Sequence, residues 1–186
     1  MLRFAASAIL IGLALSPAVA GDPRATNSAI APDPLVAELR LGIFAHDPGS
    51  PEEGSVDVNG EVLFAKPFAR DDWADALIPR PHLGATVNTA GATSSIYGGL
   101  TWQVPIGEIF FVEGSFGAAV HNGSEDGSAD RNALGCSPLF RESASAGFVI
   151  DRRVTVMATI EHMSNAGLCD ENRGLTNMGL RVGYRF

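Results

Sequence analysis

Lysine is almost absent from this chain, and basic residues are few overall. Thirteen lysines and arginines stand against 21 acids, which gives a net charge of −8 at pH 7. A protein that binds nucleic acid needs clustered positive charge to contact phosphates, so this composition argues against a nucleic-acid partner. Beyond its first twenty residues the chain also lacks any run of 18 apolar residues, so no membrane-spanning helix is predicted.

The first twenty residues have the pattern of an export signal. Arg3 provides a positive charge, residues 4–15 form a short apolar stretch, and the small-residue sequence AVA ends at Ala20. A signal peptidase cleaves after such a triplet. We therefore expect residues 1–20 to be a cleaved secretory signal, with a mature chain that starts near Gly21.

Cysteine occurs only twice, at Cys136 and Cys169, and both lie in segments rich in turn-forming residues. Exported proteins meet an oxidising environment in which thiols pair. The two cysteines therefore favour one disulfide over two free thiols.

Glycine is abundant, with 21 residues, and apolar and polar residues alternate over most of the chain. Residues 21–34 carry no such period and predict an irregular leader. From residue 35 to the end, eight runs of about ten residues are apolar on one face and polar on the other. They span 35–46, 56–66, 82–90, 94–104, 109–121, 139–150, 153–164 and 175–186. This pattern is typical of an all-β chain and indicates an eight-stranded antiparallel transmembrane β-barrel.

A soluble β-sandwich would alternate in the same way, and two features favour the barrel over it. Charged residues such as Glu38, Arg40, Glu113 and Arg181 stand in mid-strand on the polar face, as in a small barrel whose interior is filled with polar side chains. The chain also ends in GLRVGYRF, which resembles the aromatic last strand of bacterial outer-membrane barrels. Eight strands leave no open channel, so a porin is not expected.

An even number of strands places both ends of the barrel on the periplasmic side. The turns at 105–108 and 150–153 are then periplasmic, and the long segments 122–137 and 165–174 are extracellular loops. Cys136 and Cys169 would face each other on the extracellular rim of neighbouring strands. Residues 66–81 are long for a periplasmic turn, and we expect only a small packed excursion there.

The sequence EHMSN places His162 and Ser164 at the end of the seventh run, on its apolar face. That face is occupied by Val154, Val156, Ala158 and Ile160, and in a barrel it faces lipid. Polar groups that point at lipid are costly, so their presence suggests a function. A histidine that removes a proton from a serine hydroxyl is the arrangement used to cleave esters. A lipid substrate would explain why this pair faces the membrane.

The segment HMSNAGLCDENRGL, together with the terminal barrel strands, resembles the motif of the lipid A 3-O-deacylases, the PagL-type outer-membrane hydrolases. The similarity covers about residues 109–186 and is strongest from Leu134 on. It implies that His162 is the general base, that Ser164 is the nucleophile, and that Asn165 helps to stabilise the oxyanion. Asn172 also matches, in the motif Asn172-x-Gly174-Leu175.

The chain departs from this family at one position. The family has an acid fourteen residues after the histidine, and this chain has Thr176 there. A threonine can orient an imidazole, but it cannot stabilise imidazolium as a carboxylate does. Glu142, with outward parity on the neighbouring run, is the first candidate for a substitute acid. Asp170 and Glu171, in the adjacent loop, are the next.

The resemblance therefore implies an outer-membrane serine esterase of a Gram-negative bacterium that removes the 3-O-linked acyl chain from lipid A of lipopolysaccharide. The alternative is a structural or lipopolysaccharide-binding barrel with weak or no activity. Neither requires a cofactor, and no cluster of metal ligands appears in the sequence. The acidic segment 121–130 lacks the final glutamate of a calcium loop. The preferred acyl chain, and whether the protein is a monomer or a homodimer, stay open.

Overall fold

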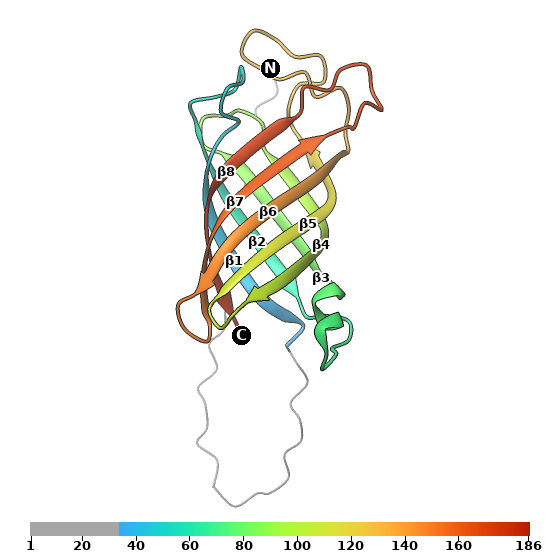
Figure 1. Cartoon of the computed structure of the whole chain (residues 1–186). Coiled ribbons are helices and arrows are strands. Elements are labelled where there is room, and N and C mark those ends of the chain that lie inside the picture. The colour runs from blue at the N-terminus through green and yellow to red at the C-terminus, as the bar shows by residue number, and fades with distance from the viewer. Residues whose placement is uncertain (1–33) are drawn as a thin grey trace, which may run out of the picture. The chain divides into compact units, whose positions relative to one another are not determined.

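The computed structural model describes residues 34–186, which form a closed antiparallel barrel of eight strands (Figure 1). The strands are β1 (Val36–Ala45), β2 (Val56–Phe64), β3 (Arg80–Asn88), β4 (Ser95–Ile106), β5 (Phe110–His121), β6 (Leu139–Val149), β7 (Val154–Ser164) and β8 (Leu175–Arg185). Pairing of β1 with β8 closes the ring. The predicted fold is confirmed. The signal peptide, and the leader as far as residue 33, lie outside the described residues.

Alternation along each strand separates an apolar outer face from a polar interior. In β1, for example, Leu41 and Ile43 are 63% and 65% exposed. The side chain of Arg40, which points to the opposite face of the same strand, is fully buried. The outward residues of the other strands are apolar in the same way. Such a band can face only lipid, because a soluble protein rarely exposes so much contiguous apolar surface. No helix among residues 34–186 is long and apolar enough to cross a membrane.

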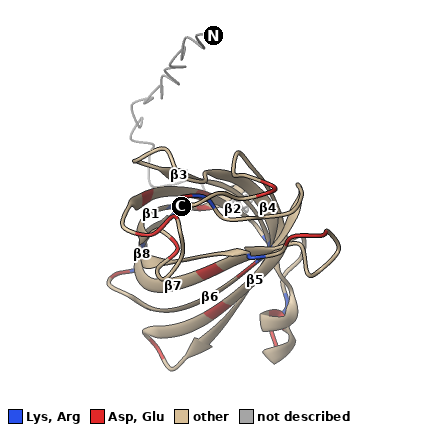
Figure 2. Ribbon diagram, turned by 90° about the horizontal axis from the view of Figure 1, so that it is seen from above, with Lys and Arg blue, Asp and Glu red and all other residues tan. Residues whose placement is uncertain are grey.

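The interior of the barrel is filled by a network of buried ion pairs. Arg40 donates to both carboxylate oxygens of Glu113 at 2.6 and 2.7 Å. Nearby, Glu161 accepts from Arg141 at 2.6 Å and from Arg181 at 3.2 Å. Figure 2, which views the barrel from above, shows acidic and basic residues on the strands of the wall. Each buried charge is compensated by a partner across the interior, which makes the lumen a packed core.

Residues 66–81, which we could not assign from the sequence, contain a short 3₁₀ helix, η1 (Trp73–Leu77). Asp72 caps its first turn by accepting from the Ala74 N–H. The carbonyl of Leu77 accepts a hydrogen bond from Nε1 of Trp102 at 3.1 Å, which holds the helix against β4. Trp73 itself is 80% exposed. The excursion is thus fixed to the wall and presents a tryptophan on its surface.

The loops at the opposite end of the barrel are joined by buried polar groups. Glu52, in the β1–β2 loop, accepts from the backbone N–H of Thr93 at 2.7 Å and from that of Asn132 at 3.0 Å. His46 bonds to Glu52 at 3.2 Å through Nε2 and to Asp57 at 2.8 Å through Nδ1. We call these five residues the rim cluster. Because it connects three loops, it gives this end of the barrel a defined shape.

Candidate active site

His162 lies near the extracellular end of β7, on the outer face of the barrel. It pairs in register with Glu142 on β6 and with Thr176 on β8. All three side chains point outward, because directly paired residues of adjacent strands share a face. His162 and Thr176 are half-buried, and Glu142 is exposed. The predicted placement of these residues on the lipid-facing surface is confirmed by the register.

The imidazole is held by a single side-chain hydrogen bond. Its Nδ1 lies 2.8 Å from the hydroxyl oxygen of Thr176. When Nδ1 carries the hydrogen and donates it to Thr176, Nε2 presents a lone pair, which is the form a general base requires. Thr176 therefore occupies the position from which the family's acid would orient the histidine.

Gly174 lies against the edge of the His162 ring that carries Cε1 and Nε2. A Cβ at this position would lie 2.8 Å from Cε1 and 3.1 Å from Nε2 of His162. The glycine also has φ +72°, a conformation that residues with a side chain rarely adopt. Glycine in the Asn172-x-Gly174 motif is therefore required twice, by its backbone and by the space that the imidazole occupies.

Ser164 is the last residue of β7 and follows His162 on the same outward face. It is half-buried and pairs with Phe140 on β6. No hydrogen bond joins its hydroxyl to His162 among the described residues. Hydrogen bonds in unliganded active sites are often long and tighten only with substrate. The two groups thus share one row, without direct contact in this state.

None of the three acids considered from the sequence hydrogen-bonds to His162 within residues 34–186. Glu142 lies beside it in register but is exposed, and Thr176 already occupies Nδ1. Asp170 and Glu171 are exposed in the β7–β8 loop. A buried carboxylate that is hydrogen-bonded to this site is that of Asp47, from the β1–β2 loop, which sequence reasoning missed. Its Oδ1 accepts from the backbone N–H of Thr176 at 2.7 Å.

Asn165 is buried and connects two extracellular loops. Its amide nitrogen donates to the carbonyls of Leu134 at 2.9 Å and Glu171 at 2.6 Å. Its backbone N–H donates to the side chain of Asn172 at 2.9 Å. Both asparagines that the resemblance singled out therefore fix the loop that follows Ser164, and both amide hydrogens of Asn165 are already in use.

The predicted disulfide is confirmed. Cys136 and Cys169 are bonded, with Cα atoms 6.2 Å apart, and the bond joins the loop before β6 to the loop after β7. These are the same loops that Asn165 connects through Leu134. The covalent bond and the buried amide together hold the extracellular side of the site.

A shallow, largely apolar groove lies on the outer wall and is lined in part by the outward row of β7 that also carries His162. It has a volume of about 690 Å³, and the small side chains of Ala144, Ala146 and Ala158 form its floor. Ile160, two residues before His162 on the same row, and Met178 on β8 also line it. A groove of this kind, open to lipid and adjacent to a base and a hydroxyl, suits an acyl chain.

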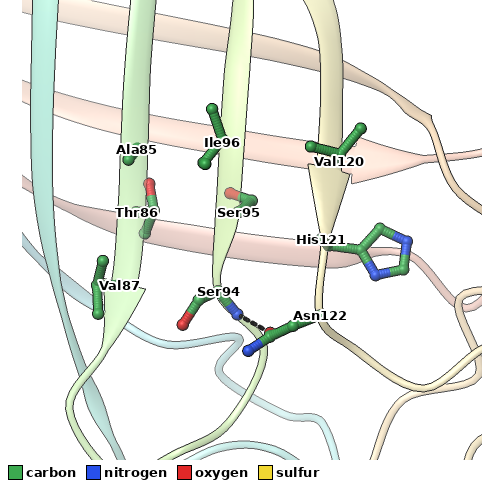
Figure 3. A pocket seen from close by; sticks show the side chains of 9 residues that line it. All are labelled: Ala85, Thr86, Val87, Ser94, Ser95, Ile96, Val120, His121 and Asn122. Carbon is green, nitrogen blue, oxygen red and sulfur yellow. Dashed lines mark hydrogen bonds between the residues drawn. The ribbon is translucent and has the colours of Figure 1, made fainter. Parts of the chain in front are cut away.

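A second hollow, of about 390 Å³, lies at the ends of β3, β4 and β5 (Figure 3). It also contains a histidine and serines, but the ring of His121 points away from Ser94 and Ser95. Its Nε2 bonds to the carbonyl of Cys136 at 3.0 Å, and its Nδ1 accepts from the Gly123 N–H at 3.1 Å. Both nitrogens are thus used by backbone groups, and His121 is structural.

Within the described residues, no group of three or more histidines, cysteines and acids is arranged to hold a metal ion.

Comparisons with known proteins identify the family and the fold. The family described as Lipid A 3-O-deacylase (PagL) matches residues 72–185, a longer stretch than the resemblance of residues 109–186 indicated. The crystal structure of the outer membrane enzyme PagL has a TM-score of 0.62 at 20% identity, covering 81% of this chain and 100% of that one. A de novo designed transmembrane β-barrel has a TM-score of 0.53 at 11% identity, covering 82% and 97%. Both likenesses show the fold.

A comparison with curated proteins finds no match. The family match covers more than half of the chain, and it includes the strands that carry His162, Ser164 and Thr176. This outer-membrane β-barrel therefore belongs to the lipid A 3-O-deacylase (PagL) family of ester hydrolases.

Proposed function

We propose that His162 and Ser164 of this barrel hydrolyse the ester of the 3-O-linked acyl chain of lipid A. The observation that carries the proposal is their position. A histidine that Thr176 holds through Nδ1 and a serine hydroxyl stand on the lipid-facing row of β7, and the same row lines an apolar groove. A lipid in the outer leaflet could place an ester against them without leaving the membrane.

The reaction proceeds in two steps. His162 Nε2 takes the proton of Ser164 Oγ as the oxygen attacks the ester carbonyl. The tetrahedral intermediate collapses, the C–O bond to the sugar breaks, and the imidazolium returns the proton to the departing sugar oxygen. Water then attacks the acyl-enzyme with the same base, and the fatty acid leaves as Ser164 regains its hydrogen.

The neighbours of the pair orient it. Thr176 holds Nδ1 and selects the tautomer in which Nε2 is the base. Glu142 pairs with His162 from β6, on the side opposite Thr176, and its negative charge favours the imidazolium. Asn165 and nearby backbone N–H groups stabilise the oxyanion. For its side chain to donate directly, Asn165 must release the carbonyl of Leu134 or Glu171.

The groove on β6 to β8 is the proposed seat of the acyl chain that is cleaved. Its alanines leave room between the larger side chains of Ile160 and Met178. A homodimer is compatible with this reaction only if its interface leaves the β6–β8 wall open to lipid.

Export by a cleaved signal completes the proposal. The small-x-small triplet that ends at Ala20 predicts a mature chain beginning near Gly21. N-terminal sequencing of protein purified from outer membranes tests this, because a start at Met1 would contradict cleavage.

Mass spectrometry of lipid A tests the catalytic assignment. Cells that make the wild-type barrel should yield lipid A lighter by one acyl chain, and cells that make Ser164→Ala should not. Ser137→Ala is a matched control, because Ser137 is exposed on the same rim but outside the outward row of β7. Equal deacylation by wild type and Ser164→Ala would refute the nucleophile.

The second candidate is a lipopolysaccharide-binding barrel without activity. The observation that favours it is Thr176, which hydrogen-bonds where the family has an acid. A folded wild type that binds lipopolysaccharide but releases no fatty acid from it would establish this alternative.

A further inference from the structure

Asp47 occupies an unusual place in the fold. It lies just beyond the end of β1, with φ +36°, and is 7% exposed. A residue with a side chain adopts positive φ only at some cost in free energy, so the surrounding contacts must favour it. Two of those contacts lead to β8. Its backbone N–H donates to the side chain of Asn177 at 3.1 Å, and its Oδ1 accepts from the Thr176 N–H at 2.7 Å.

The hydrogen bond to Thr176 continues the sheet where β1 has ended. The β1–β8 ladder stops at the pair of Ala45 and Met178. Thr176, two residues farther along β8, has therefore lost its backbone partner on this side. The carboxylate of Asp47 supplies the missing acceptor. It thereby fixes the backbone of the residue whose hydroxyl holds His162.

The carboxylate is itself held by a buried side chain. Its Oδ2 accepts from Nδ2 of Asn132, which is fully buried in the β5–β6 loop. All hydrogen bonds to this carboxylate within residues 34–186 come from neutral donors, and Asp47 takes part in no ion pair there. Neutral donors hold an anion in place without cancelling its charge. The negative charge of Asp47 thus remains available to act on the site.

We propose that Asp47 is a positioning residue for the His162–Ser164 pair, and that its carboxylate supplies, through Thr176, the negative charge that the family's acid would supply directly. This inference rests on the function proposed above. Imidazolium forms as Ser164 is deprotonated, and a fixed negative charge one side chain away stabilises it. The other charged groups around the imidazole are Glu142 on β6 and Asp170, Glu171 and Arg173 in the β7–β8 loop, all exposed to screening by water.

Asp47→Asn is the direct test, because it removes the charge and keeps the shape. The new amide oxygen can still accept from the Thr176 N–H. The amide of Asn132 can rotate to meet the new NH₂ group, since its own Oδ1 is buried with no partner among residues 34–186. The rotation gives up only the 3.4 Å hydrogen bond from Nδ2 of Asn132 to the carbonyl of Gly174. We expect kcat for fatty-acid release from lipopolysaccharide in detergent micelles to fall on the order of tenfold, with KM within about twofold of wild type. The thermal midpoint should stay close to that of wild type.

Glu52→Gln is the matched control. Glu52 is another buried carboxylate of the β1–β2 loop and accepts from the backbone N–H of the same Asn132, but it does not contact Thr176. We expect this variant to unfold at a lower temperature and to keep the kcat of wild type. If kcat falls in both Asp47→Asn and Glu52→Gln, in proportion to the loss of stability of each, then Asp47 has only a structural role and the proposal is overturned.

Combining Asp47→Asn with Thr176→Glu tests whether it is the charge of Asp47 that matters. A carboxylate placed directly on His162 makes the charge of Asp47 redundant, so Asp47→Asn should then change kcat less than about twofold. An unchanged tenfold loss in that background, or equal kcat for Asp47→Asn and wild type, would contradict the inference alone. Absence of activity in wild type, as in Ser164→Ala, would instead remove the proposed function itself.

Discussion

The hydroxyl of Thr176 lies 2.8 Å from Nδ1 of His162, across the β7–β8 pair. This contact takes the place of the acid–histidine bond that the resemblance implies for the family. It orients the ring through Nδ1, and Gly174 lies against the edge that carries Cε1 and Nε2. The rate of the enzyme should therefore depend on the hydroxyl at position 176.

Thr176→Val keeps the shape and the β-branched side chain but removes the hydroxyl. We expect kcat for lipid A deacylation to fall by roughly 10- to 100-fold, because the free imidazole can turn and change tautomer. Thr176→Ser, which retains the hydroxyl, should stay near wild type, and Thr176→Glu should exceed it if a missing carboxylate limits the rate. Activity of Thr176→Val equal to that of Thr176→Ser would show that the hydrogen bond has no catalytic role.

The period of two along the sequence was sufficient to predict the eight strands and the outward direction of His162, Ser164 and Thr176. Parity alone decides which face a residue occupies once one face is apolar. The choice of Glu142 as substitute acid followed from the same argument. The pairing is present, but parity does not say which of two neighbours reaches Nδ1, and in the structure Thr176 does.

The contact of Asp47 with Thr176 could not be predicted in this way. The two residues are 129 positions apart, and Asp47 belongs to a loop with no period. Its place depends on a backbone conformation that is favoured only after β1 and β8 have paired. The bonds of Asn165 to the carbonyls of Leu134 and Glu171 depend on two loops in the same manner. Loop contacts of this type follow from tertiary structure and leave no local pattern.

The exposed Trp73 of η1 should lie in the membrane interface. It is held near the wall by the bond from Trp102 to Leu77, and Leu77 and Phe68 beside it are each 62% exposed. Tryptophan prefers the boundary between headgroups and acyl chains. We take the fluorescence of Trp73 as the difference between wild type and Trp73→Phe, so that the bond from Trp102 to Leu77 stays intact. We expect lipids brominated near the headgroup to quench this difference signal more than lipids brominated near the chain end. Emission typical of water with no quenching would contradict this placement.

The disulfide should contribute to both stability and activity. It closes a loop with a sequence separation of 33, for which chain-entropy arguments give about 3 to 4 kcal/mol. We expect the double variant Cys136→Ser, Cys169→Ser to lose stability of this order in chemical unfolding. Activity should also fall, because the loop around Asn165 is anchored to the Cys136 side only by hydrogen bonds in this variant. A reduced wild type should behave like the double variant, and full stability after reduction would count against this role.

The rim cluster should make stability depend on pH. Burial disfavours the charged form of His46, but Asp57 and Glu52 raise the pKa of its imidazole to about 9 from the ordinary value of 6.5. Burial likewise opposes ionisation of Glu52, but hydrogen bonds from His46 and from the N–H groups of Asn132 and Thr93 lower its pKa from 4.5 to about 2. The charged pair is therefore favoured in the folded protein.

The direction of each shift sets the pH range. The contribution of His46 is complete below pH 6.5 and is lost as the pH rises through about 9, and that of Glu52 is complete above pH 4.5 and is lost as the pH falls through about 2. Thermal midpoints of wild type and His46→Gln should differ most between pH 4.5 and 6.5 and converge above about pH 9. A constant difference across that range would show that the charge of His46 does not stabilise the rim.

Gly174 and Gly167 offer a matched pair that separates backbone strain from contact with the catalytic histidine. Both lie in the β7–β8 loop with nearly the same positive φ, +72° and +78°. A Cβ at Gly174 would lie 2.8 Å from the His162 ring and 3.0 Å from the backbone oxygen of Met163, whereas a Cβ at Gly167 would meet nothing within 4 Å. Alanine at either position should cost about 1 to 2 kcal/mol of stability through the backbone.

Only Gly174→Ala should also displace the imidazole. The methyl group would push the ring off Thr176 or turn Nε2 away from the serine, and a shift of about 1 Å can cost on the order of 100-fold in rate. We therefore expect kcat of the folded protein to fall by that order in Gly174→Ala and to stay near wild type in Gly167→Ala. Gly174→Ala should also unfold at a lower denaturant concentration, because its methyl group meets the Met163 carbonyl as well as the ring. Equal activity in the two variants would mean that the ring tolerates the methyl group, and that the glycine of the motif serves only the turn.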